Sequence, residues 1–229
     1  MLGKRAARSH LAAMDSHASY IYLHEAATQC GFAVNALKGL QNVLARLRDA
    51  RDPSDVERSR TLHAEVFRSL HSFLTHASNV SRLFWPPAPR RRNREGESRA
   101  AYKARCAIDP SLVRGRALRD ATGLPERDHA LKSRRMRDHL EHFDERLDEW
   151  YTTSTRRNYV QDYIGPPGGI VGIDPGDMMR CFDPLTNRLR FRGEEYDLTL
   201  LTAAVVDVQD RIAAALDSLE QSRRPVRTT

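Results

Sequence analysis

Apolar residues recur at helical spacing along the first third of the chain. Between residues 15 and 48 they fall every three or four positions without an intervening proline, which predicts one long amphipathic helix. Pro53 ends this helix, and the sequence Ser54-x-x-Glu57 has the form of a capping box that starts a second helix. The second helix keeps the same spacing until the prolines of FWPPAP forbid its continuation.

The middle of the chain alternates loop and helix signals. Residues 86–99 are rich in proline and arginine and predict a basic loop, which a short helix follows near residues 100–106. Asp109 has the features of an N-cap, Pro110 those of a first helical residue, and Gly123 those of a C-terminal stop. These three signals together predict a further helix.

The stretch from about residue 130 to residue 150 carries one apolar stripe with charged flanks. The apolar residues lie alternately four and three positions apart: Met136, Leu140, Phe143, Leu147 and Trp150. This spacing predicts a helix whose stripe faces the interior of a bundle. The alternative is a helix that only packs in the bundle, with its charged outer face exposed to solvent.

Residues 155–197 differ in character from the rest of the chain. Glycine and proline dominate their first part, and two runs of alternating apolar and polar residues then flank a Pro-Leu-Thr-Asn turn, which predicts a β-hairpin. Residues 198–222 return to helical spacing and predict the last helix. The expected fold class is all-α: a single helical-bundle domain over residues 1–229, with a small β-hairpin insertion before the last helix.

The net charge of the chain indicates which class of partner it favours. Lys and Arg number 37 against 30 Asp and Glu, which gives a net charge of +7. This excess favours anionic partners, nucleic acid first, although interspersed acidic residues also fit a charge that only keeps the chain in solution. The candidate nucleic-acid contacts are two groups of arginines, Arg90, Arg91, Arg92, Arg134 and Arg135.

Cysteine usage and the absence of long apolar runs indicate the compartment. The three cysteines lie far apart and show no metal-ligand spacing, which suits a reducing environment. No apolar run has the length of a secretory signal or a membrane span. His139 and His142 lack the Glu-x-x-His and His-Glu-x-x-His patterns of helix-borne metal sites. We therefore expect a cytoplasmic chain with no membrane partner, cofactor or metal.

Arg137 and His142 border the apolar stripe. On one continuous helix they point about 140° apart and are displaced by about 7.5 Å along the axis, so one copy does not bring both side chains onto one atom. Two antiparallel copies across a two-fold axis could pool two guanidinium groups and two imidazoles in one cleft. Histidine suits acid–base chemistry near neutral pH, and guanidinium suits the charge of a phosphate in its transition state.

The sequence Arg137-Asp138-His139-Leu140-Glu141-His142 resembles the Arg-polar-x(3)-His motif of the HEPN domain, named for its occurrence in higher eukaryotes and prokaryotes. The resemblance covers the helical parts, about residues 15–150 and the last helix. Many HEPN proteins are metal-independent endoribonucleases that act as homodimers. Several are toxins of toxin–antitoxin or phage-defence systems and pair with a small nucleotidyltransferase. The resemblance thus implies RNA, a second copy of this chain and a nucleotidyltransferase-type antitoxin as partners.

The resemblance also implies roles for three residues. Arg137 stabilises the phosphate, His142 serves acid–base chemistry as a ribose 2′-hydroxyl attacks the adjacent phosphorus, and Asp138 orients the arginine. Asp138 departs from the asparagine more common in active members, and Asp144 stands where some toxins carry the tyrosine that their partner modifies. The alternative is a non-catalytic helical bundle that binds nucleic acid or protein.

Overall fold

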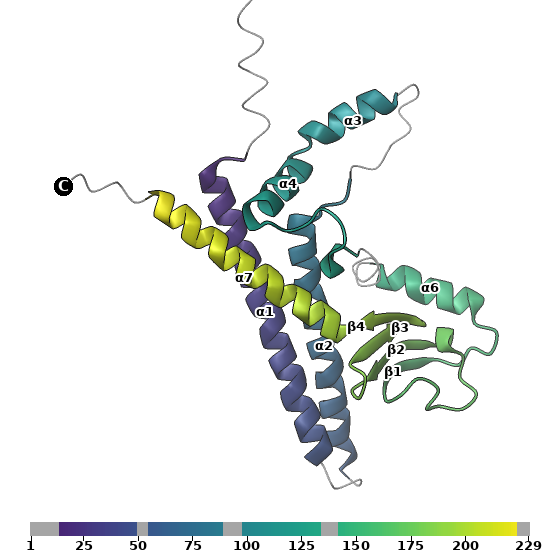
Figure 1. Cartoon of the computed structure of the whole chain (residues 1–229). Coiled ribbons are helices and arrows are strands. Elements are labelled where there is room, and N and C mark those ends of the chain that lie inside the picture. Colours follow the sequence, from purple (N-terminus) through teal and green to yellow (C-terminus); the bar gives the residue numbers. More distant parts are fainter. Residues whose placement is uncertain (1–13, 50–54, 89–97, 134–141, 224–229) are drawn as a thin grey trace, which may run out of the picture. The chain divides into compact units, whose positions relative to one another are not determined.

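The computed structural model describes residues 14–49, 55–88, 98–133 and 142–223 (Figure 1). The chain divides into two compact units. The first unit comprises residues 1–31, 79–132 and 206–229, and the second comprises residues 32–78 and 133–205. The described chain is largely helical, with a small four-stranded sheet ahead of the last helix, as the sequence predicted in outline.

Three long helices occupy their predicted places: α1 (Ser16–Asp49), α2 (Val56–Phe84) and α7 (Leu198–Arg223). An aspartate directly precedes each of them, and its Oδ1 accepts the N–H of the residue three positions on, at 2.7 to 3.0 Å. For α2 this residue is Asp55, which accepts the N–H of Arg58. Asp55 therefore caps α2, one residue after the predicted Ser54, which lies outside the described residues.

Three shorter helices lie wholly in the first unit: α3 (Arg99–Ile108), α4 (Pro110–Thr122) and the 3-10 helix η1 (Ala130–Lys132). Asp109 caps α4 by accepting two backbone N–H groups, and Gly123 ends α4 at a φ of 65°. The predicted start and stop of α4 are thus confirmed. Arg119 of α4 donates to the carbonyl of Phe84, and Trp85 Nε1 donates to the carbonyl of Pro125 at 3.1 Å. These bonds hold α4 and the loop after it against the end of α2.

The predicted continuous helix over residues 130–150 is wrong. Residues 130–132 form only the single turn η1, Ser133 is not helical, and α6 begins at Phe143 and ends at Thr153. None of the residues of α6 is fully buried, and Phe143 is 38% exposed. Because the part of the apolar stripe that lies in α6 is not fully buried, the packing that stabilises most protein helices is weak there, and periodicity alone does not fix where α6 starts.

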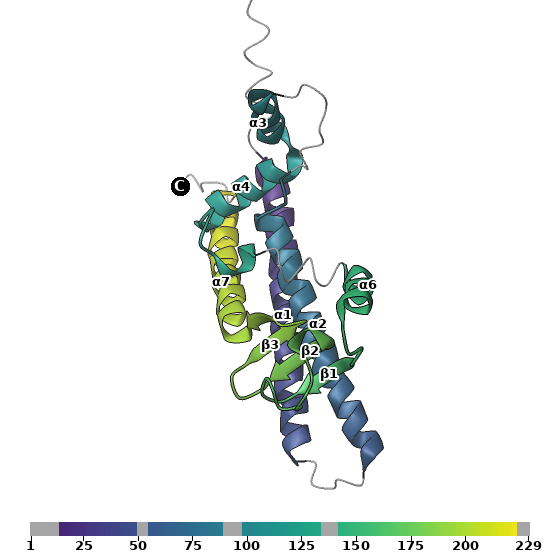
Figure 2. The same ribbon diagram turned by 90° about the vertical axis from the view of Figure 1, so that its right-hand side faces the viewer.

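The second unit contains a mixed sheet in the order β1-β2-β3-β4. Its strands are β1 (Val160–Ile164), β2 (Met178–Asp183), β3 (Arg188–Phe191) and β4 (Glu194–Asp197), and a 3-10 turn, η2 (Pro175–Asp177), leads into β2. β1, β2 and β3 run side by side (Figure 2). The predicted hairpin is confirmed as the antiparallel β2–β3 pair. It is part of a larger sheet, because β1 joins it in parallel and β4 joins it in antiparallel pairing.

The two faces of this sheet differ in chemistry. Phe182 pairs with Leu189, and Arg180 pairs with Phe191, so these residues share one face. The Arg180 guanidinium on that face lies 5.7 Å from the ring centre of Phe67 in α2. The opposite face carries ion pairs across β3 and β4, in which Arg188 and Arg190 both contact Glu195. The first face therefore contacts α2 through Arg180, and the opposite face combines its cross-strand ion pairs with the buried side chains of Met179 and Cys181.

Candidate active site

The structure describes one of the residues that the sequence marked for catalysis or nucleic-acid binding. His142 directly precedes α6. The other marked residues lie outside the described ranges: Arg90, Arg91, Arg92, Arg134, Arg135, Arg137 and Asp138. The site is therefore built from His142 and the side chains around α6.

His142 occupies the cap position of α6. Its φ of −113° and ψ of 41° are not helical, while its carbonyl accepts the N–H of Arg146 at 3.1 Å and so begins the helix. Asp144 and Glu145 follow in the first turn, where carboxylates complement the positive end of the helix dipole. The angle and spacing expected between Arg137 and His142 assumed one continuous helix through both residues. They do not apply, because the backbone of His142 is not helical.

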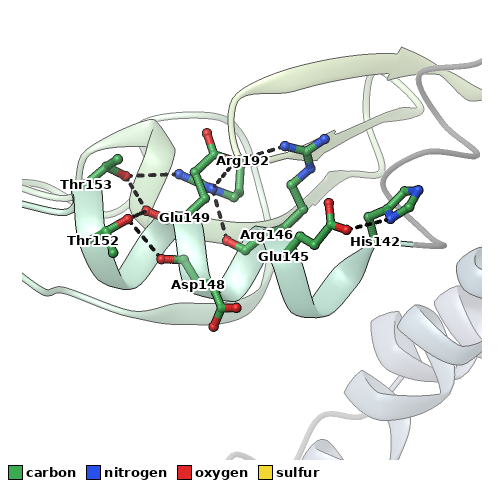
Figure 3. Close-up of polar contacts among 8 residues, drawn as sticks. All are labelled: His142, Glu145, Arg146, Asp148, Glu149, Thr152, Thr153 and Arg192. Carbon is green, nitrogen blue, oxygen red and sulfur yellow. Dashed lines mark hydrogen bonds and ion pairs between the residues drawn. The ribbon is translucent and has the colours of Figure 1, made fainter. Parts of the chain in front are cut away.

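The imidazole of His142 is paired with a carboxylate of its own helix. Nδ1 of His142 lies 3.1 Å from Oε1 of Glu145, and the His142 side chain remains 41% exposed (Figure 3). A carboxylate at Nδ1 favours the tautomer in which Nδ1 carries the proton, and this leaves Nε2 with the lone pair. This arrangement suits a general base that faces solvent and can receive a proton from a substrate hydroxyl.

A second polar cluster follows along the same side of α6. Arg146 Nη1 lies 2.9 Å from Glu149 Oε2, and Arg192, from the turn between β3 and β4, lies 2.9 Å from the same oxygen. The hydrogen bond from Arg146, and then the charge of Arg192, lower the pKa of the Glu149 carboxyl. Glu149 therefore stays ionised near neutral pH and bridges two guanidinium groups (Figure 3).

The C-terminal half of α6 is fastened to the segment before β2. Trp150 Nε1 donates to Oδ1 of Asp177 at 3.0 Å, and the Trp150 ring lies edge-on to Tyr159 with ring centres 4.9 Å apart. Thr153 Oγ1 donates to the carbonyl of Glu149 at 2.7 Å within the last turn. These contacts fix α6 through polar groups and one aromatic pair.

A partly buried ion pair lies on the face of the sheet that contacts α2. Asp162 of β1 and Arg180 of β2 are register partners, with Nε to Oδ1 at 2.6 Å and Nη2 to Oδ2 at 3.2 Å. Burial raises the pKa of Asp162, against the opposing charge of Arg180. Desolvation, and then the charge of Arg180, lower the pKa of His71 on α2. Both shifts arise from packing of the sheet on α2, and the pair cross-links the two strands.

His129 of the first unit is a buried histidine held in its neutral form. Its side chain is 9% exposed and stacks on Trp85, with ring centres 4.7 Å apart. Nδ1 accepts the N–H of Leu131 at 3.3 Å, and Nε2 lies 3.7 Å from Oδ2 of Asp207 in α7. Desolvation lowers the pKa of His129; Asp207 opposes this shift, and Arg211 adds to it. A proton on Nδ1 would also cost the bond from Leu131.

We expect this histidine to make the chain less stable in acid. Because its pKa is lower in the folded state, the unfolded chain binds the proton first, so the stability is complete above about pH 6.5 and declines as the pH falls towards the folded pKa. Urea unfolding between pH 5 and pH 8 measures this decline. His129→Asn keeps an acceptor for Leu131 and should flatten the pH dependence; an unchanged slope in this variant would contradict the assignment.

Among the residues that the structure describes, no group of three or more His, Cys, Asp or Glu side chains is arranged to hold a metal ion. Within the same ranges, no helix is both long enough and apolar enough to cross a bilayer. No protein-family model, curated protein or solved structure matches this chain. The arrangement around α6 therefore has to be interpreted from its own chemistry.

Sequence reasoning found His142 but not the residues that hold it. Glu145 lies three positions after His142, a spacing that places neighbours on one helix face, so it could have been recognised had the helix start been known. Arg192 lies 46 residues from its partner Arg146 and gives no local signal. Asp162 and Arg180 become partners only through the parallel register of β1 and β2.

Proposed function

We propose that this chain is a HEPN-like, metal-independent endoribonuclease that acts as a homodimer, with Arg137 and His142 as its catalytic residues. The observation that carries the proposal is the pairing of His142 Nδ1 with Glu145 at the exposed start of α6. It supplies a solvent-facing imidazole with an orienting carboxylate, five residues after the arginine of the motif. The net charge of +7 suits an RNA substrate.

The proposed reaction is an internal transesterification. Nε2 of His142 takes the proton of a ribose 2′-hydroxyl as its oxygen bonds to the adjacent phosphorus. The bond from phosphorus to the 5′ oxygen breaks, and the protonated His142 of the second copy gives that oxygen a proton. Arg137 stabilises the negative charge on the phosphoryl oxygens. The products carry a 2′,3′-cyclic phosphate and a 5′-hydroxyl, and no metal takes part.

The reaction is tested by incubating purified chain with single-stranded RNA in EDTA and identifying the product ends. Cleavage that leaves 2′,3′-cyclic phosphate ends, and that stops in both Arg137→Ala and His142→Ala, supports the proposal. Salt-sensitive binding without cleavage, weakened when Arg90, Arg91 and Arg92 are neutralised, overturns it in favour of a nucleic-acid-binding protein. Sedimentation of the same samples shows whether the active species contains two copies.

A further inference from the structure

The turn between β3 and β4 holds an arginine in a conformation that favours glycine. Phe191 pairs with Glu194, so the loop has only two residues, Arg192 and Gly193, with φ values of 46° and 85°. This is the left-handed geometry of a two-residue hairpin turn, whose first position favours Asn, Asp or Gly. Residues without this preference persist there when the surrounding structure holds them, and such positions gather at functional sites.

The side chain of Arg192 shows what holds it. Nη1 donates to the carbonyl of Arg146 at 3.0 Å and pairs with Glu149, and Nη2 donates to Oγ1 of Thr153 at 3.4 Å (Figure 3). The side chain is 13% exposed. Its three contacts follow one side of α6 over two turns. One guanidinium group therefore binds residues along most of the length of this helix.

Arg146 connects Arg192 to His142 through backbone hydrogen bonds. Arg146 accepts the bond from Arg192 with its carbonyl, and its own N–H donates to the carbonyl of His142 at 3.1 Å. On the other side, the N–H of Arg192 lies 3.1 Å from the carbonyl of Met178 and 3.2 Å from that of Met179, which ties the turn to β2. Because α6 buries none of its residues completely, these polar bonds replace the apolar packing that would otherwise fix it.

We propose that Arg192 is a positioning residue, through which the sheet sets where α6 begins and how it presents the imidazole of His142. This gives the 155–197 excursion a role: it is the support of the proposed site. The catalytic part of the inference rests on the function proposed above. The mechanical part, that Arg192 holds α6 and orients the ring, is independent of it.

The test uses the full chain and compares Arg192→Asn with Arg188→Asn. Asparagine suits the left-handed turn, so Arg192→Asn removes the side-chain contacts with α6 without straining the hairpin. Arg188 lies on neighbouring β3 and pairs with Glu195 and Asp197, away from α6, which makes it the matched control. We expect amide exchange in α6 to speed up at least about tenfold in Arg192→Asn, since charged hydrogen bonds are lost, and to stay unchanged in Arg188→Asn.

Two readouts separate positioning from a purely structural role. The nitrogen chemical shifts of the His142 ring should lose the Nδ1–H tautomer signature in Arg192→Asn, and kcat for RNA cleavage should fall about 10- to 100-fold with KM little changed. Arg192→Lys, which keeps the positive charge and one donor nitrogen, should recover part of both. Unchanged exchange in α6, or faster exchange with an unaltered His142 signature, overturns the positioning role. If the wild-type chain cleaves no RNA, the proposed function fails, and the exchange and ring measurements still decide this inference.

Discussion

Replacing His142 with alanine is expected to lower kcat for RNA cleavage by about 10²- to 10⁴-fold, the range that a general base contributes. The fold should not suffer, because the side chain is 41% exposed and its polar partner is the exposed carboxylate of Glu145. Surface substitutions of this kind usually change the free energy of unfolding by no more than about 0.5 kcal/mol. Single-turnover cleavage of a labelled RNA measures the effect, with the melting temperature as a check of folding.

Two variants sharpen this result. Glu145→Gln keeps the size of the side chain but removes the charge at Nδ1, and loss of such an orienting partner should cost about 10- to 100-fold. His24→Ala removes an exposed histidine from α1 and should leave cleavage unchanged. If His142→Ala cleaves RNA within a factor of about two of the wild-type rate, the assignment of His142 as acid–base catalyst is wrong.

Local signals predicted the helices well, because helix starts and stops are set by neighbouring residues. Asp109 and Gly123 delimit α4 as expected, through bonds that reach no further than a few positions. The observed cap of α2, Asp55, lies one residue after the predicted one, because neighbouring Ser and Asp residues both carry an oxygen suited to capping. Errors of this size follow from the chemistry of capping.

The segment around α6 shows that hydrophobic periodicity does not predict the bounds of a helix. Its stripe has regular helical spacing, yet Ser133 is not helical and the helix begins at Phe143. A hydrophobic pattern predicts the face that a helix would bury, but it does not show whether the helix runs unbroken through positions such as Ser133 and His142. In α6 the stripe is incompletely covered, and polar contacts from the sheet take over.

The sheet could be predicted only in its local part. The β2–β3 hairpin follows from alternation around one turn, whereas the parallel pairing of β1 with β2 joins segments separated by the glycine-rich stretch. For the same reason the sequence marked His142 but not Arg192, whose role depends on a turn conformation and on contacts with a distant helix. Candidate catalytic groups can be found from residue type, but their supports require the fold.

Replacement of Gly31 and of Gly115 by alanine should change the free energy of unfolding in opposite directions. Alanine in a helix interior is favoured over glycine by about 0.8 to 1 kcal/mol. At Gly31 of α1 an added Cβ meets no atom within 4 Å, so Gly31→Ala should raise the free energy of unfolding by about that amount. At Gly115 of α4 an added Cβ would lie 2.5 Å from Cδ of Pro86 and 2.9 Å from the carbonyl oxygen of Phe84.

Gly115→Ala should therefore lower the free energy of unfolding by about 1 to 3 kcal/mol, as overpacking of a close contact does. Neither neighbour can move cheaply, because Pro86 is rigid and the carbonyl of Phe84 already accepts the bond from Arg119. Urea unfolding of the two variants beside the wild type measures both changes. Stabilisation by Gly115→Ala of the same size as by Gly31→Ala would mean that α4 does not approach the end of α2 so closely. Opposite signs would establish that approach and, with it, the packing that anchors the loop carrying His129.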